Sequence, residues 1–107
     1  MTEPVYEQKA LIYKALAHPI RVQIVEYLAL GEKSVSEIVE HVGAKKSNTS
    51  RHLAVLRAAG VVETRKDGLA VYYNLRLPCL MKMCSCVNEA LLKKAEYHKK
   101  IARNVRR

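Results

Sequence analysis

Apolar residues in the first part of the chain recur at helical spacing, and single residues interrupt the pattern. A first helix is expected to end at His18, because Pro19 cannot continue a helix and also restricts the residue before it. Apolar side chains lie on nearly every side of this helix, which predicts contacts on two sides. They are Leu11, Ile12, Ala15 and Leu16.

Two further helices follow, each with a recognisable start and end. Pro19 suits the first position of a second helix, which Gly31 ends. Ser34 and Glu37 form a capping box ahead of a short third helix, which Gly43 closes. The apolar positions of the second helix are Ile20, Ile24, Val25 and Leu28, and those of the third are Val35, Ile38, Val39 and Val42.

A fourth helix is predicted over residues 46–59, with Gly60 beyond its end. Its buried stripe is expected to consist of Thr49, Leu53 and Leu56. At about 100° per residue, the opposite face carries mostly short or polar side chains. The outward residues are Ser47, Asn48, Arg51, Ala54 and Val55.

Two strands are predicted next, over residues 61–66 and 69–75. Asp67 and Gly68 between them favour a tight two-residue turn, and Arg65 and Lys66 make the tip of the hairpin basic. Pro78 then opens a last helix that can run to the C-terminus. The sequence therefore predicts a mainly α fold with a small β-hairpin.

Composition fits one globular domain over residues 1–107, because a chain of 107 residues that is 50% hydrophobic can bury a single core. No window approaches the roughly 18 apolar residues of a membrane span, and the start of the chain is too charged for a signal peptide. A cytoplasmic protein without a membrane partner is expected. The three cysteines are odd in number and crowded together, unlike a secreted disulfide framework.

The charge is uneven along the chain. Nineteen basic residues against ten acidic ones give a net charge of +9. Residues 1–50 hold six of each sign, so the whole excess lies in residues 51–107. A strongly basic half predicts an anionic polymer as partner, with nucleic acid first.

Two consecutive short helices followed by a basic hairpin are typical of a winged helix-turn-helix DNA reader. Short polar side chains and an arginine on the fourth helix can reach base edges, and the basic hairpin tip can reach the backbone or the minor groove. Each such residue alone could equally be an ordinary solvated position. Together they predict binding of a double-stranded DNA operator. The candidate DNA-binding residues are Lys45, Lys46, Ser47, Asn48, Ser50, Arg51, His52, Arg65 and Lys66.

The chain resembles the ArsR/SmtB family of winged-helix repressors over nearly its whole length. Three blocks carry the resemblance: residues 17–21 (AHPIR), residues 50–62 (SRHLAVLRAAGVV), and Gly68 with residues 72–75 (YYNL). The resemblance implies a homodimer through the first and last helices, a recognition helix over residues 46–59, and repression that an inducer relieves. Family members usually have Ser or Thr where this chain has Lys45, so either Lys45 contacts phosphate or the helix cap shifts to Ser47.

Most metal sites that recur in this family lack their ligands here. Residues 40–60 contain no cysteine, and neither does the second helix. At the positions that match the last-helix zinc site, the chain has Leu77, Cys79, Ala90 and Lys93, of which only Cys79 could bind a metal. The remaining candidates are Cys79, Cys84 and Cys86.

Helical geometry decides how these three thiols could act. Cys79 and Cys86 share a helix face but lie about 10 Å apart along the axis, and Cys84 is rotated by about 200° from Cys86. One straight helix therefore cannot close a three-thiolate site or an unstrained disulfide, and a second chain or local unwinding is required. The family's zinc site implies that the last helices of a dimer cross antiparallel near residues 84–86. Such a crossing would bring Cys86, and with it Cys84, close to the same cysteines of the other chain.

The sequence thus predicts a transcriptional repressor, not an enzyme, with no permanently bound cofactor. Its expected inducer is a thiophilic metal or metalloid such as arsenite or cadmium, held by Cys79, Cys84 and Cys86. Redox or reactive-sulfur sensing by the same cysteines is one alternative. A winged-helix module for protein partners, in which the cysteines only pack, is the other.

Overall fold

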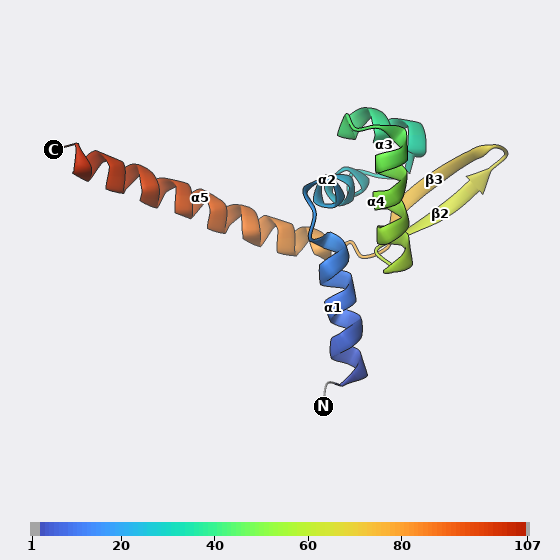
Figure 1. The fold of residues 1–107 in the computed structure, drawn as a ribbon, viewed down its shortest axis with the longest axis horizontal. Helices are drawn as coiled ribbons and strands as arrows, with labels where there is room; N and C mark the ends of the chain where they lie inside the picture. Colours follow the sequence, from blue (N-terminus) through green and yellow to red (C-terminus); the bar gives the residue numbers. More distant parts are fainter. Residues whose placement is uncertain (1–2, 107) are drawn as a thin grey trace.

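The computed structural model describes residues 3–106 and contains the expected order of elements (Figure 1). Five helices and a hairpin follow one another as the sequence predicts, and one additional short strand precedes the third helix. The elements are α1 (Pro4–Leu16), α2 (Pro19–Leu28), β1 (Lys33–Ser34), α3 (Val35–Val42), α4 (Lys46–Ala58), β2 (Val62–Asp67), β3 (Ala70–Leu75) and α5 (Leu80–Val105).

The core lies between α2, α3, α4 and the sheet. The predicted stripe of α4 is confirmed, because Thr49, Leu53 and Leu56 are each at most 1% exposed. Apolar side chains from the other elements complete this core. They are Ile24, Val25, Leu28, Ile38, Val61, Val62 and Leu80. Helix α4 is therefore fixed by its inner face, and its outer face is not part of the core.

Local capping explains where α2 and α3 begin. The Nδ1 atom of His18 accepts a hydrogen bond from the backbone N–H of Ile20 at 3.1 Å. Ser34 and Glu37 form the predicted capping box, in which each side chain accepts from the other residue's backbone N–H. That backbone hydrogen bond from Ser34 also holds the pKa of the Glu37 carboxyl below its ordinary value.

The sheet is antiparallel with the strand order β1-β3-β2, and the β2–β3 hairpin extends from the body as a wing (Figure 1). The predicted turn is wrong by one residue, because Asp67 pairs with Ala70 and the turn consists of Gly68 and Leu69. Gly68 has φ +62°, which suits a hairpin turn with glycine at its first central position. Leu69, expected in the strand, is fully exposed at the tip.

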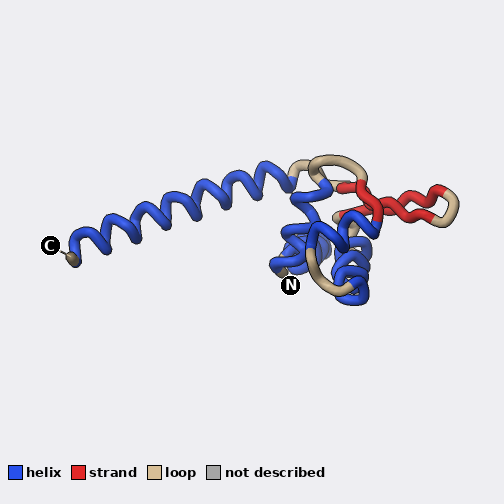
Figure 2. The backbone as a smooth tube through the Cα atoms, turned by 90° about the horizontal axis from the view of Figure 1, so that it is seen from above, coloured by secondary structure: helices blue, strands red, loops and turns tan. Residues whose placement is uncertain are grey.

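Helix α5 extends away from the body as a single rod over most of its 26 residues (Figure 2). It begins at Leu80, two residues later than predicted, after turn-like hydrogen bonds from Leu80 to Leu77 and from Met81 to Pro78. Leu80 is its only buried residue, and a stripe that includes Met83, Val87 and Leu91 is exposed. A solvent-exposed apolar stripe on a projecting helix is typical of a surface that packs against another chain.

Within residues 3–106, no helix is both long enough and apolar enough to cross a membrane.

Candidate nucleic-acid interface

Helices α3 and α4 form a helix-turn-helix whose turn depends on one glycine. Gly43 follows α3 with φ +73°, and its N–H donates to the carbonyl of Val39 at 3.0 Å. A left-handed residue at this position ends α3 and redirects the chain toward α4. Both helices pack on α2 through their buried residues. The outward face of α4 is thereby held rigidly on the body of the domain.

The outward face of α4 carries the residues that the sequence assigned to it. The side chains of Ser47, Arg51, Ala54 and Val55 are exposed and that of Asn48 is half-buried. Of the remaining candidates on or before α4, Lys45, Lys46 and Ser50 are exposed, while His52 is half-buried. Seven candidates for DNA contact therefore come from one helix and its cap.

The N-terminus of α4 has no side-chain cap. Lys45 is the N-cap residue and makes no capping hydrogen bond, so the cap does not shift to Ser47. The first backbone N–H groups of α4 therefore lack the acceptor that a Ser, Thr or Asp cap would supply. Free N–H groups, the positive end of the helix dipole and two lysines at one end of a helix favour an anion there.

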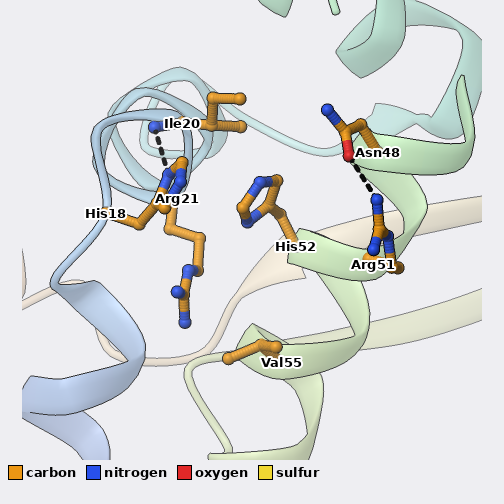
Figure 3. A pocket seen from close by; sticks show the side chains of 7 residues that line it. All are labelled: His18, Ile20, Arg21, Asn48, Arg51, His52 and Val55. Carbon is orange, nitrogen blue, oxygen red and sulfur yellow. Dashed lines mark hydrogen bonds between the residues drawn. The ribbon is translucent and has the colours of Figure 1, made fainter. Parts of the chain in front are cut away.

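Arg51 and Asn48 are coupled one helical turn apart. The Nη2 atom of Arg51 donates to the Asn48 side-chain oxygen at 2.7 Å (Figure 3). This hydrogen bond orients both groups on the exposed side of α4 and leaves the other guanidinium donors and the amide N–H₂ free. An arginine fork and an amide at this spacing can pair with the edges of bases.

His52 points toward the start of α2. Its ring lies 4.2 Å from that of His18 between centroids, and Arg21 lies beside the pair (Figure 3). Burial lowers the pKa of His52, and the nearby charges of His18, Arg21 and Arg51 lower it further. His52 is therefore part of a junction between α2 and α4 that the sequence pattern alone did not reveal.

The two basic residues of the wing differ in their surroundings. Arg65 donates to the Glu32 carboxylate through Nη2 and, at 3.2 Å, through Nε, and its guanidinium lies 4.8 Å from the centre of the Tyr72 ring. Asn74 donates to the same carboxylate at 2.8 Å. Together, Arg65 and Asn74 hold the pKa of Glu32 below its ordinary value. Lys66 is exposed and forms no ion pair with residues 3–106.

The three cysteines lie at the base of α5 in different surroundings. Cys79 is the N-cap residue and is exposed, Cys84 is half-buried, and Cys86 is exposed. Cys84 lines a groove of about 410 Å³ between α1, α2 and α5, next to Glu26 and Val22 of α2. Burial raises the pKa of the Cys84 thiol, and the Glu26 carboxylate adds to the effect.

The cysteines do not meet within one chain. In the described part of the protein, no three side chains of His, Cys, Asp or Glu gather closely enough to hold a metal ion. Cys84 and Cys86 instead lie at opposite margins of the exposed apolar stripe of α5, because residues two apart are about 200° apart around a helix.

A helix-turn-helix with a projecting hairpin beside its second helix defines a winged helix-turn-helix protein. The model of the arsR family of bacterial regulatory proteins matches residues 18–64. The HTH-type transcriptional regulator Rv0081 of Mycobacterium tuberculosis is 41% identical over 91 residues, which cover 84% of this chain and 80% of that protein. The chain belongs to the ArsR family.

Solved structures agree with this assignment. The crystal structure of M. tuberculosis Rv0081 superposes with a TM-score of 0.74 at 38% identity, over 89% of this chain and 96% of that one. The homodimeric winged helix-turn-helix DNA-binding domain of Mb0332 from Mycobacterium bovis gives a TM-score of 0.76 at 31% identity, over 84% and 86%. The probable mercury resistance operon repressor of Streptomyces lividans is 32% identical over 81 residues, 73% of this chain and 65% of that protein.

These comparisons confirm the predicted family and the predicted fold. The chain is a transcriptional regulator with a DNA-binding winged helix-turn-helix.

Proposed function

We propose that this chain is a homodimeric repressor that binds a nearly palindromic duplex and leaves it when Cys79, Cys84 and Cys86 bind a thiophilic metal or metalloid such as arsenite or cadmium. The DNA-binding part of this proposal rests on the exposed outward face of α4. There, the hydrogen-bonded Asn48 and Arg51 lie beside a lysine-rich helix N-terminus without a side-chain cap. One α4 would lie in the major groove of each half-site, and the wing beside it would reach the neighbouring backbone.

Dimer formation is supported by the unpartnered apolar surface of α5. Its exposed stripe continues to Ile101 and Val105, and α1 adds exposed Tyr6, Leu11 and Tyr13. The structural relative Mb0332 is described as homodimeric. Two copies related by a two-fold axis would place their α4 helices about one DNA turn apart, which gives a palindromic site.

The choice of inducer rests on the placement of the thiols. The three cysteines lie where α5 leaves the body, so ligands bound there would act on the helix that joins the protomers. Soft thiolate donors select soft ions such as arsenite and cadmium. A relative from S. lividans carries the name of a mercury resistance repressor, which is consistent with a thiophilic inducer.

Exposure of Cys79 and Cys86 supports a second candidate inducer, a reactive sulfur or oxygen species. Exposed thiols can be oxidised or persulfidated without prior assembly of a closed metal site. Mass spectrometry of the released protein separates the two candidates. A bound metal or metalloid on cysteines that are neither oxidised nor persulfidated indicates metal sensing, whereas an added sulfur or oxygen indicates redox sensing.

Replacing Arg51 on the outward face of α4, which we call the reading face, tests the DNA assignment. Arg51→Ala removes the guanidinium that Asn48 orients, so specific binding should weaken by about 1–3 kcal/mol while binding to a scrambled duplex changes little. Fluorescence anisotropy with a duplex that the protein selects from a random pool measures both. Arg103→Ala, which removes one charge from the distal end of α5, is the matched control. Equal specific affinities for Arg51→Ala and the wild type would contradict the assignment.

The wing is expected to act through charge rather than base reading. Lys66→Ala should weaken binding about equally on all sequences and reduce the slope of log K against log salt by about one unit, as the loss of one phosphate contact does. Arg65→Ala should do the same and also loosen the wing, because the link to Glu32 is lost. Glu32→Gln separates these effects, since it loosens the wing without removing a cation. An unchanged salt slope in Lys66→Ala would exclude a phosphate contact by the wing tip.

A further inference from the structure

A small basic hollow of about 370 Å³ lies at the junction of α2 and α4, beside the reading face (Figure 3). Two arginines and two histidines line it: Arg21 and His18 at the start of α2, and Arg51 and His52 on α4. None of the residues that line it is acidic. Four basic groups from two helices around one hollow create a local positive potential that favours an anion.

The donors of this hollow are incompletely used within the protein. The Nε atom of Arg21 is buried without a hydrogen-bond partner in residues 3–106. The Nδ1 atom of His18 accepts from Ile20, so Nε2 carries the ring's N–H in the neutral form and can donate outward. Arg51 uses one donor on Asn48 and keeps the others. A buried donor without an acceptor costs free energy, which an oxyanion in the hollow would recover.

We infer that this junction is a phosphate site in which His18 and Arg21 of α2, together with His52 of α4, hold a backbone phosphate of the bound duplex. The inference rests on the proposed DNA binding and adds a second helix to the interface. We assign the anion as a DNA phosphate rather than a free anion, because Asn48 and Arg51 line the same hollow and belong to the reading face. A helix that lies in the major groove has backbone phosphates at its flanks.

The geometry gives this phosphate contact a dependence on pH. His52 faces His18 and Arg21 across the junction and Arg51 on its own helix, and no acidic residue lines this hollow. A phosphate placed among these groups would favour the protonated ring of His52. Complex formation would then take up a proton, and the affinity for DNA would rise as the pH falls from 8 to 6.

The test combines variants of the junction with single neutral phosphates in the DNA. The duplex is one that the wild type selects from a random pool, and each phosphate of a half-site is replaced in turn by methylphosphonate. At one position per half-site, the wild type should lose about tenfold in affinity. Arg21→Gln should show a similar loss on unmodified DNA and no further loss at that position. His52→Gln should remove most of the pH dependence.

Controls separate this inference from the proposed function. Arg21→Lys keeps the charge and should retain part of the affinity, and thermal melting confirms that each variant is folded. A folded Arg21→Gln with wild-type affinity and salt slope on the selected duplex would overturn the phosphate site while leaving DNA binding intact. If the wild type selected no duplex, the proposed function itself would fail. DNA binding should be inhibited about equally by millimolar inorganic phosphate and by chloride at equal ionic strength. Much stronger inhibition by phosphate would indicate a site for free anions and overturn the assignment to a DNA phosphate.

Discussion

Replacing Cys79, Cys84 and Cys86 together with serine is expected to abolish release from DNA by the inducer while leaving binding of the uninduced protein intact. A ligand that moves a dimer from almost fully competent to almost fully incompetent must prefer the second state by about 5.5 kcal/mol, or about 10⁴-fold. Two or more sulfur bonds to a thiophilic ion can supply this difference. Serine keeps the size of the side chain but is a poor ligand for soft ions.

Single variants rank the three thiols. Cys86→Ser is expected to cause the largest loss of response, followed by Cys84→Ser and Cys79→Ser, because antiparallel α5 helices that cross near residues 84–86 would bring Cys86 close to its counterpart. Anisotropy of the preformed complex, titrated with arsenite or cadmium, measures each response. If the triple variant released DNA with the same inducer as the wild type, the cysteines would not be the sensor and would only pack.

Shortening one core residue of α4 should destabilise the domain strongly. Leu53 is 1% exposed and packs in the core beneath the reading face, so Leu53→Ala is expected to cost about 2–5 kcal/mol of unfolding free energy. Chemical denaturation at fixed protein concentration measures the change. Val55→Ala is the matched control, because Val55 lies on the outward face of the same helix and is 40% exposed. A surface change of this kind should alter stability by only about 0.5 kcal/mol. Similar losses for both variants would contradict the assigned faces of α4.

Much of the fold follows from local patterns in the sequence. The spacing of Thr49, Leu53 and Leu56 places all three on one side of a helix. Their burial therefore determines which face of α4 points outward. The capping box of Ser34 and Glu37 and the left-handed Gly43 mark the ends of α3. These features depend on residues within four positions of one another, so a single sequence is enough to find them.

Contacts between distant residues could not be predicted in this way. Arg65 was expected at the tip of the hairpin, yet it pairs with Tyr72 within the sheet and binds Glu32, which lies 33 positions earlier. The two-residue strand β1 is too short to show an alternating pattern, and it appears only because β3 offers an edge to pair with. The pairing of His18 with His52 and the position of Cys84 over Glu26 likewise depend on how whole helices pack.

Release from DNA by a thiophilic inducer is tested most directly by adding candidate inducers to the wild-type protein bound to its selected duplex. The complex is formed at fixed salt and pH and then titrated separately with arsenite, cadmium, zinc, persulfide and peroxide, while anisotropy reports the bound fraction. We expect two chains per duplex and release by arsenite or cadmium at concentrations where zinc has no effect. A complex that survives all five additions, or that forms equally on scrambled DNA, would contradict this expectation.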